Sequence, residues 1–434
     1  MESKLNNQRL RRAFILTMCA LFALFLTLLL SGNVMGQSTV FYLSGEDFQA
    51  DALNTEVYAR ELNPYGYSET ETHVPFKDAN YPPLAYLLFY LMDTVSGRDA
   101  ETARAAAVSV ALSALCLAGL ITVCYCMLDA PRPGRIGFAL ALLLSGVSLN
   151  AVERGNIILL AAGLCAFFLA GYRSARPVVR ELAFVALAVA AALKIFPALF
   201  GLLLLFERRW KDALRLLLYG VVAAFLPFVF MKGGFGNLPL LLENFGAHKA
   251  FYDRLTYPRY GFRLFSSLAY DLCWANPWLE RNVWKLGEKL LLATPWADLL
   301  FTALCLVYAL LAGDLWRKAA AIAFVLINYP VNSGAYTALY LFPVIALYLS
   351  CGALRKRDLW YAACFLLILS PVQLPLPYDL LGITQGVMVS LSDILRNLVV
   401  YGLFLVFAAK GAVAGVRFLR GRGQSDSRPS VTSV

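Results

Sequence analysis

The sequence predicts an all-α polytopic membrane protein, and three observations lead to this class. Of the 434 residues, 60% are hydrophobic and only 15% are charged, against roughly a quarter charged in a soluble domain. The mean hydropathy is +0.64. The apolar residues form blocks such as 13–31 and 398–416, each near the roughly 20 residues that cross a bilayer as a helix. Helices are the expected form of these spans because each satisfies its own backbone hydrogen bonds.

The basic residues indicate the orientation of the chain. They lie at the termini and in short connections between the apolar blocks, and the positive-inside rule places such residues in the cytoplasm. The net charge of +10 therefore reflects membrane topology, and no nucleic-acid partner is expected. Placing every basic cluster inside gives one consistent path with both termini in the cytoplasm. The clusters are 9–12, 131–135, 173–180, 207–215, 316–318, 355–358 and 416–423.

This path predicts about twelve membrane helices in a single domain, residues 1–434. The first helix is expected to be retained, since its apolar run is longer than the core of a typical signal peptide. Pro197 and Lys194 divide the range 181–206 into two short helices that meet near the outer face. The predicted helical ranges are 13–31, 104–128, 136–150, 156–172, 181–193, 195–206, 213–231, 296–313, 318–331, 336–351, 358–372 and 395–417.

The stretch YPPLAYLLFYLMDTV at 81–95 does not fit this path as a span. It is apolar but short, and a crossing here would place the next basic clusters outside. We therefore expect an interfacial or re-entrant helix with Pro82 and Pro83 in its first turn. Two substantial outer segments result, 32–103 and 232–295, and long loops commonly carry function.

The two outer segments differ in charge. An acidic segment beside a basic one suits a reaction in which a carboxylate deprotonates a hydroxyl while cations bind a lipid phosphate at the interface. The alternative is that solvated loops simply carry these charges, and that the opposite signs hold the loops together. The acidic residues of 32–103 are Glu46, Asp47, Asp51, Glu56, Glu61, Glu69, Glu71 and Asp78, and the basic residues of 232–295 are Lys232, Lys249, Arg254, Arg259, Arg263, Arg281, Lys285 and Lys289.

The order of residues in the first outer segment resembles a known family. Asp47 follows the first helix, an Ala-containing stretch comes next, and then Asn63-Pro64-Tyr65 and Tyr81-Pro82-Pro83-Leu84. This order resembles the opening of the GT-C membrane glycosyltransferases, and most closely the polyprenyl-phosphate-mannose-dependent group called family 87.

A second match lies downstream, so the resemblance covers about 1–350. It comprises Gly155-Asn156, Lys194 with Pro197, and Arg208-Arg209-Trp210, followed by an aromatic and proline-containing pair of helices at 328–349. There are two departures. Arg154 precedes Gly155-Asn156 where the family pattern has Gly-Gln before its Asn, and no His stands near 332–336.

The resemblance implies a GT-C-like bundle in the plasma membrane with its active site on the outer face. It implies inverting transfer of a hexose, mannose first, from a polyprenyl-phosphate-linked donor to a lipid or glycan acceptor. The partners are therefore the donor lipid, the acceptor and the bilayer. The sequence requires no cofactor and indicates no metal site. Aspartates near a phosphate can hold a divalent ion, but Lys194 and the arginines can also supply the positive charge.

Two aspartates are the candidate catalytic residues. Asp47 matches the family's motif and is the expected general base, although Asp is also a favoured N-cap and could start a helix at 48–62. Asp51 lies one turn later on the same face, so it is expected to bind an acceptor hydroxyl or to act as the base itself.

The expected substrate-binding residues are mostly cationic. Lys194 lies in apolar sequence, where an ionisable residue indicates function, although a lysine at a helix end can also snorkel to the surface. Arg154 adjoins the helix that begins at Asn156, whose N-terminus favours phosphate. The remaining candidates are Arg254, Arg259 and Arg263, which bind the phosphate or anchor the segment to the membrane, and Tyr65 and Tyr81, which stack on sugars or belong to an aromatic belt.

Three other functions are compatible with the sequence. A glycolipid transporter or flippase also needs a cationic lipid-phosphate site, but it should show two matching broken helices, and only the break within 181–206 is evident. A non-catalytic membrane scaffold predicts that Asp47→Asn has no effect. A transferase of another sugar, such as arabinose, galactose or an amino sugar, fits the same residues. Neither His73 nor His248 receives a role.

Overall fold

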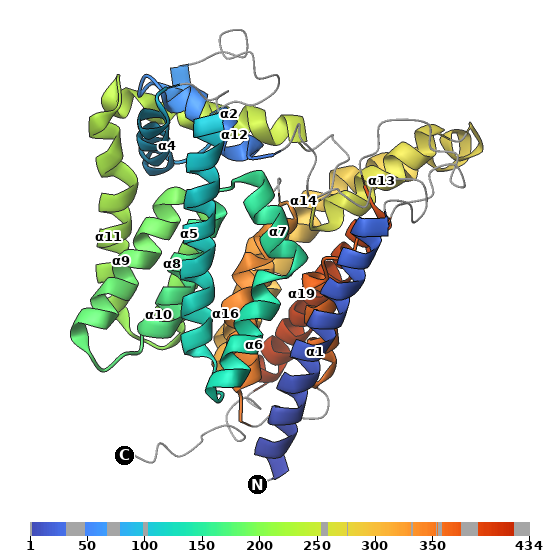
Figure 1. Cartoon of the computed structure of the whole chain (residues 1–434). Helices are drawn as coiled ribbons and strands as arrows, with labels where there is room; N and C mark the ends of the chain where they lie inside the picture. The colour runs from blue at the N-terminus through green and yellow to red at the C-terminus, as the bar shows by residue number, and fades with distance from the viewer. Residues whose placement is uncertain are drawn as a thin grey trace.

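A computed structural model describes residues 2–31, 48–66, 79–98, 103–252, 259–275, 277–330, 333–352, 354, 358–374 and 389–420. Over these residues the chain is helical and contains no strand. Figure 1 shows the helices gathered into a bundle, with the N-terminus at the lower end. Asp47 and Arg254, both predicted site residues, lie outside the described residues.

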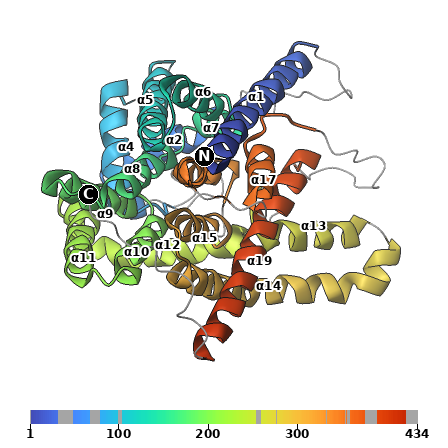
Figure 2. The same ribbon diagram turned by 90° about the horizontal axis from the view of Figure 1, so that it is seen from below.

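Two groups of helices form the bundle. One group surrounds α8 and the other surrounds α15, as the views in Figures 1 and 2 show. α1 (Glu2–Ser31) packs against α6 (Arg132–Leu143) at the edge. The first group contains α5 (Ala103–Met127), α8 (Ile158–Gly171), α9 (Pro177–Leu193), α10 (Leu202–Phe206) and α11 (Trp210–Phe225), and the second contains α14 (Pro277–Leu311), α15 (Leu315–Asn328), α16 (Leu341–Ser350), α17 (Trp360–Leu369) and α19 (Leu391–Leu419).

Shorter helices cover the upper end of the bundle, opposite the N-terminus (Figure 1). They belong to the two segments that the sequence predicts outside, so the described parts of those segments are largely helical. The tight packing of α2 on α4 brings the first segment down onto the bundle. These elements are α2 (Ala50–Ala59), η2 (Pro64–Gly66), α4 (Pro83–Ser96), η5 (Gly234–Gly236), α12 (Asn237–Tyr252) and α13 (Phe262–Ala275).

The centre of the bundle is α15. Nearly every residue from Trp316 to Asn328 is buried, and a helix that is apolar on all sides is expected in a core. The run AAAIAFVLI places small residues along it, which lets α14, α16 and α19 approach closely.

The number of membrane spans is only partly as predicted. Five described helices are long and apolar enough to cross a bilayer, or six if α6 and α7 (Gly146–Arg154), which meet at 51°, form one bent span. The other apolar helices are shorter than the roughly 20 residues of a span. About twelve spans are therefore not confirmed. The five are Gln8–Ser31, Ala103–Met127, Trp210–Phe230, Glu288–Leu311 and Leu391–Leu419.

The helix break predicted at Lys194 and Pro197 is confirmed. α9 ends at Leu193, Lys194 is extended, and η3 (Phe196–Gly201) follows with Pro197 in its first turn. The short helix predicted at 81–95 is also present as α4, in which Pro82 is the N-cap and Pro83 the first residue. Whether α4 enters the membrane stays a prediction.

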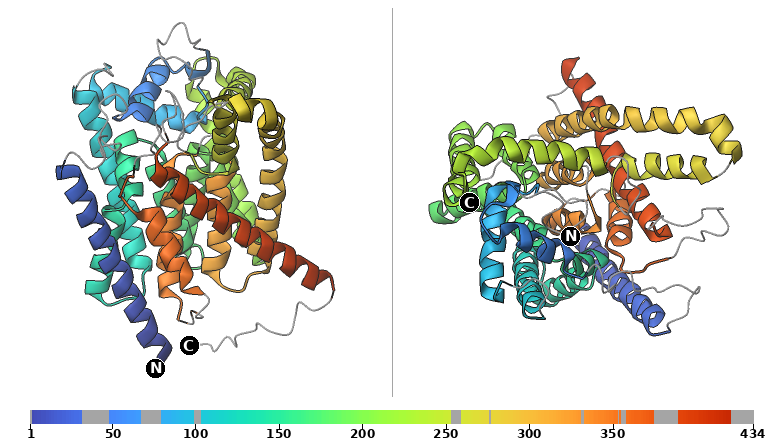
Figure 3. Two further views of the ribbon diagram at one scale, coloured as in Figure 1. Left: turned by 90° about the vertical axis from the view of Figure 1, so that its right-hand side faces the viewer. Right: turned by 90° about the horizontal axis from the view of Figure 1, so that it is seen from above.

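α14 and α19 pack closely against each other, and their crossing is visible in Figure 3. A Cβ atom added to Gly411 would lie 1.9 Å from the carbonyl oxygen of Leu304. One added to Gly415 would lie 3.6 Å from Val307. Two glycines four residues apart share one face of α19, which is a common way for membrane helices to bring their backbones together.

Candidate active site

A cavity of about 490 Å³ lies beneath the helices of the upper end. Its volume is within the usual range for small-molecule sites. Residues from α2, the start of α8, the α9–η3 break, α12, α13, α14 and η6 (Ala335–Tyr340) line it. Much of the wall is aromatic, a surface that suits the faces of sugar rings. The aromatic lining residues are Tyr58, Tyr81, Tyr86, Phe196, Phe245, Tyr329, Tyr336 and Tyr340.

Asp51 forms the polar centre of one wall. It lies in the first turn of α2 with an 11% exposed side chain. Its Oδ1 accepts a hydrogen bond from Nη2 of Arg154 at 2.7 Å, and its Oδ2 accepts one from Nδ2 of Asn156 at 2.7 Å. Both carboxylate oxygens are thus engaged, and charge-assisted bonds of this length hold the group in one orientation.

The turn between α7 and α8 brings Arg154 and Asn156 together. Gly155 ends α7 with φ of 63°, in the left-handed region that favours glycine. The next residue, Asn156, accepts a hydrogen bond on Oδ1 from the backbone N–H of Ile158 at 2.9 Å. Because Oδ1 accepts this hydrogen bond at the start of α8, the amide nitrogen of Asn156 points towards Asp51.

Lys194 reaches the cavity from the break between α9 and η3. Its Nζ lies 4.9 Å from the centre of the Tyr81 ring, a distance typical of a cation–π contact. The backbone of Tyr81 is held in place by Tyr65, whose hydroxyl donates a hydrogen bond to the Tyr81 carbonyl at 2.8 Å. Tyr65 does not line the cavity; it is 3% exposed and packs edge-on against Tyr86.

The predicted arginines of the second outer segment occupy different places. Arg263 lines the cavity. Arg259 is buried away from it and donates from Nη2 to the hydroxyl of Ser267 at 3.2 Å. The structure therefore brings Asp51, Asn156, Lys194, Tyr81 and Arg263 to one cavity, with Arg154 bonded to Asp51.

Several polar lining residues were not predicted from the sequence. Asp298 is 2% exposed and lies within the membrane-length helix α14. An ionisable residue in such a helix is itself a signal of function, and this signal could have found it. His248 and Lys249 enter from α12, and Asn80 directly precedes Tyr81.

One comparison with known proteins identifies the family. The profile of glycosyltransferase family 87 matches residues 80–327, more than half of the chain. The chain belongs to glycosyltransferase family 87. No curated protein matches it. The matched range includes Tyr81, Arg154, Asn156 and Lys194, whereas Asp51 precedes it. This family 87 member is a membrane glycosyltransferase, and Asp51 lines its candidate cavity.

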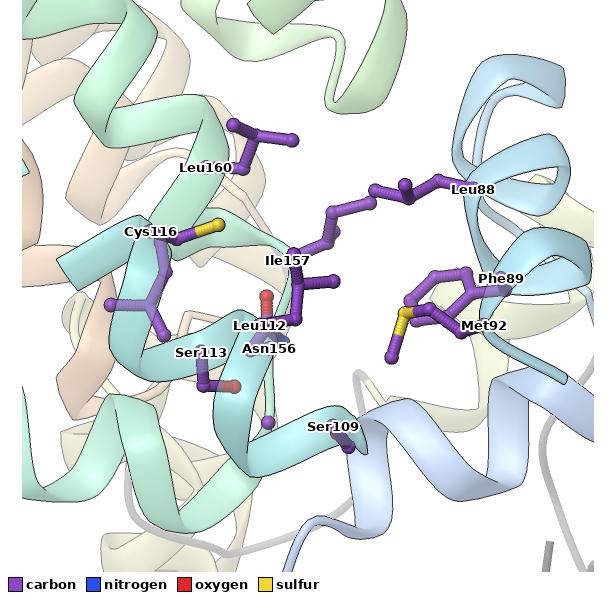
Figure 4. Close-up of a pocket in the computed structure, with 12 residues that line it drawn as sticks. Leu88, Phe89, Met92, Ser109, Leu112, Ser113, Cys116, Asn156, Ile157 and Leu160 are labelled. Carbon is purple, nitrogen blue, oxygen red and sulfur yellow. The ribbon is translucent and has the colours of Figure 1, made fainter. Parts of the chain in front are cut away.

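A second, narrower space adjoins the site of this family 87 protein. It lies between α4, α5 and α8, and Figure 4 shows Leu88 and Phe89 facing Leu112 and Leu160 across it. Asn156 lines both spaces. At about 20 Å³ the crevice has room for a single water, so the larger cavity is the candidate substrate site.

The candidate site of the family 87 enzyme has cations, a carboxylate and aromatic rings. Among the residues that the structure describes, no group of three or more His, Cys, Asp and Glu side chains is placed to hold a metal ion. The arrangement suits binding of an anionic group by Lys194 and Arg263 and of sugar hydroxyls by Asp51 and Asn156.

Proposed function

We propose that the protein transfers a hexose, mannose first, from a polyprenyl-phosphate-linked donor to a lipid or glycan acceptor at the outer face of the plasma membrane. The observation that carries the proposal is the meeting of Asp51, Asn156 and Lys194 at one aromatic cavity, with Arg154 bonded to Asp51. The family, whose activity is glycosyl transfer, supports it.

The proposed reaction is a single displacement with inversion. The acceptor hydroxyl oxygen forms a bond to the anomeric carbon of the donor sugar, and the bond from that carbon to the phosphate oxygen breaks. The electron pair leaves with the polyprenyl phosphate, and the proton of the hydroxyl passes to a carboxylate base. Cations next to the phosphate stabilise the charge that develops on it in the transition state.

The roles of the two aspartates differ in this proposal. Both oxygens of Asp51 already accept hydrogen bonds from Arg154 and Asn156, so Asp51 is suited to hold and orient a sugar hydroxyl. Asp47, four residues earlier, keeps the proposed role of general base. Lys194, which lies over the Tyr81 ring, is proposed to contact the donor phosphate together with Arg263, which lines the same cavity from α13.

Transfer from a radiolabelled donor tests the function. Proteoliposomes containing the full chain would receive polyprenyl-phosphate-mannose labelled in the sugar, with a polar-lipid extract as the source of acceptor. Label should move from the donor to a new product, and Asp47→Asn should reduce that transfer at least about 100-fold, the lower range expected for loss of a general base. Glu61→Gln is the matched control, because Glu61 lies just beyond α2 and is 60% exposed.

Each other result points to a different function. Full transfer by Asp47→Asn would overturn the assignment of the base. Consumption of polyprenyl-phosphate-arabinose in place of the mannose donor would contradict the proposed sugar but support the proposed type of reaction. Movement of intact labelled lipid across the bilayer without sugar transfer would contradict the enzyme and support a flippase.

A further inference from the structure

Gln49 has an unusual place at the start of α2. It is fully buried, with φ of 58° in the left-handed region that few non-glycine residues adopt. A backbone in this region costs free energy and persists only where surrounding contacts hold it. Its carbonyl accepts the first hydrogen bonds of the helix, from the N–H groups of Ala52 at 3.1 Å and Leu53 at 3.0 Å.

The other polar groups of Gln49 bond to two different helices. Its backbone N–H donates to the carbonyl of Glu153, and its side-chain amide donates to the carbonyl of Val152. Both carbonyls belong to the last turn of α7, where helices leave acceptors unsatisfied. On the other side the hydroxyl of Ser109, in α5, donates to Oε1 of the Gln49 side chain.

The fit around the side chain is tight at Gly155. A Cβ atom at Gly155 would lie 2.5 Å from Oε1 of Gln49. Gly155 stands between Arg154 and Asn156, the two residues that bond to Asp51. Gln49 therefore contacts the backbone of the very turn whose side chains hold the carboxylate two residues after it.

We infer that Gln49 is a positioning residue for the transfer reaction. It fixes the N-terminus of α2 to α5 and α7 so that Asp51, at the wall of the cavity, bonds to Arg154 and Asn156. The inference rests on the proposed function in one respect, namely that Asp51 takes part in transfer. Misplacement of a reacting group by about 1 Å can lower a rate by about 100-fold, so removal of the amide should reduce turnover while the donor KM changes little.

A double-mutant cycle tests this role. Transfer by the full-length protein in proteoliposomes, with labelled polyprenyl-phosphate-mannose, would be measured for Gln49→Ala, Asp51→Asn and the double variant, each normalised to folded protein. Gln49→Ala should lower kcat between about 10-fold and 100-fold. In the Asp51→Asn background, Gln49→Ala should cause no further loss of kcat, because Gln49 acts through Asp51. Ser109→Ala, which removes one of the bonds to Gln49, should have a smaller effect.

Gln49→Glu supplies a second readout if Gln49→Ala does not fold. The ionised carboxyl has no N–H or O–H to donate to Val152, whereas the protonated carboxyl has one. The rate of this variant relative to the native protein should therefore rise as the pH is lowered from about 8 to about 5.

Three outcomes separate this inference from the proposed function. Full activity of Asp51→Asn would contradict the role of Asp51 and the inference with it. An inactive Asp51→Asn beside a fully active Gln49→Ala would overturn the inference alone. Losses that multiply in the double variant, together with a flat relative pH profile for Gln49→Glu, would also overturn it, because Gln49 would then act independently of Asp51.

Discussion

At the scale of single residues, Lys194 offers the clearest separation of binding from chemistry. It follows the end of α9, and its ammonium lies over the Tyr81 ring. Lys194→Ala should raise the KM for a polyprenyl-phosphate donor by about tenfold or more, since a hydrogen bond to a charged group is worth about 1.5–3 kcal/mol. Steady-state kinetics at varied donor concentration would measure this. The control is Lys232→Ala, which removes a 63% exposed lysine outside the cavity, and an equal rise in both variants would exclude phosphate binding by Lys194.

Glu56 gives a prediction about pH. It is fully buried on α2, and neither carboxyl oxygen has a hydrogen-bond partner among the residues that the structure describes. The pKa of Glu56 is raised from 4.5 to about 7; burial is the largest cause, the nearby charge of Asp93 adds to the rise, and Arg60 opposes it. The folded protein thus binds this proton more tightly than the unfolded chain. The stabilisation is complete below about pH 4.5 and is lost as the pH rises through about 7.

Thermal unfolding in detergent would measure this effect. The Tm of the native protein should fall between about pH 5 and about pH 8. Glu56→Gln, which cannot ionise, should show a smaller fall, and the exposed Glu61→Gln should behave as the native protein does. Parallel curves for the native protein and Glu56→Gln would contradict the prediction.

The sequence identified part of the site because residue type and position are local properties. Asp51, Asn156, Lys194, Tyr81 and Arg263 were all candidates and all line the cavity. The sequence could not separate Tyr81 from Tyr65, because which ring faces the cavity depends on tertiary contacts such as that of Tyr65 with Tyr86 of α4. The sequence also offered no reason to place Asp298 or His248 at this cavity, because α12 and α14 reach it beside α2 only through tertiary packing.

At the scale of elements, the crossing of α14 and α19 is a test of backbone contact. Gly411→Ala would place a methyl group 1.9 Å from the carbonyl oxygen of Leu304, which belongs to a helix and cannot turn away. The helices must separate, so the variant should lose about 1–3 kcal/mol of stability. The matched control is Gly402→Ala on the same helix, where an added Cβ meets nothing within 4 Å.

Chemical and thermal unfolding of the two variants would check this crossing. Gly411→Ala should unfold at a clearly lower temperature than the native protein, and Gly402→Ala should be unchanged or slightly more stable, since alanine favours helix over glycine. If the two variants unfold at the same temperature, the close contact between Gly411 and Leu304 is contradicted.

Helix boundaries followed from the sequence where local chemistry is strong. Proline and lysine in apolar sequence located the α9–η3 break, and Pro82-Pro83 located the start of α4. The bend between α6 and α7 was not predicted. At the bend, Ser145 accepts a hydrogen bond from the N–H of Ser148 and so caps the start of α7. A serine such as Ser145 is a weak signal of a helix break when the whole range 136–150 is apolar enough to read as one helix.

At the scale of the whole molecule, topology is the property to measure. α2 and the residues after it lie at the end opposite the N-terminus (Figure 1), and the turn after α8 lies at the other end. In a variant free of native cysteines, Glu61→Cys should react with a membrane-impermeant maleimide applied to intact cells, and Ser174→Cys should react only after the membrane is opened. The reverse pattern would place the cavity in the cytoplasm.

The lengths of neighbouring helices have a consequence for how a lipid-linked sugar reaches the protein. α5 has 25 residues and α8, packed beside it, has 14, which correspond to about 38 Å and about 21 Å. The hydrocarbon layer is about 30 Å thick, so α8 falls about 9 Å short of crossing it. We therefore expect Asn156, which precedes α8 and lines the aromatic cavity, to lie below the headgroup level. The proposed polyprenyl-phosphate donor would then enter the cavity sideways from the bilayer, without leaving the hydrocarbon layer.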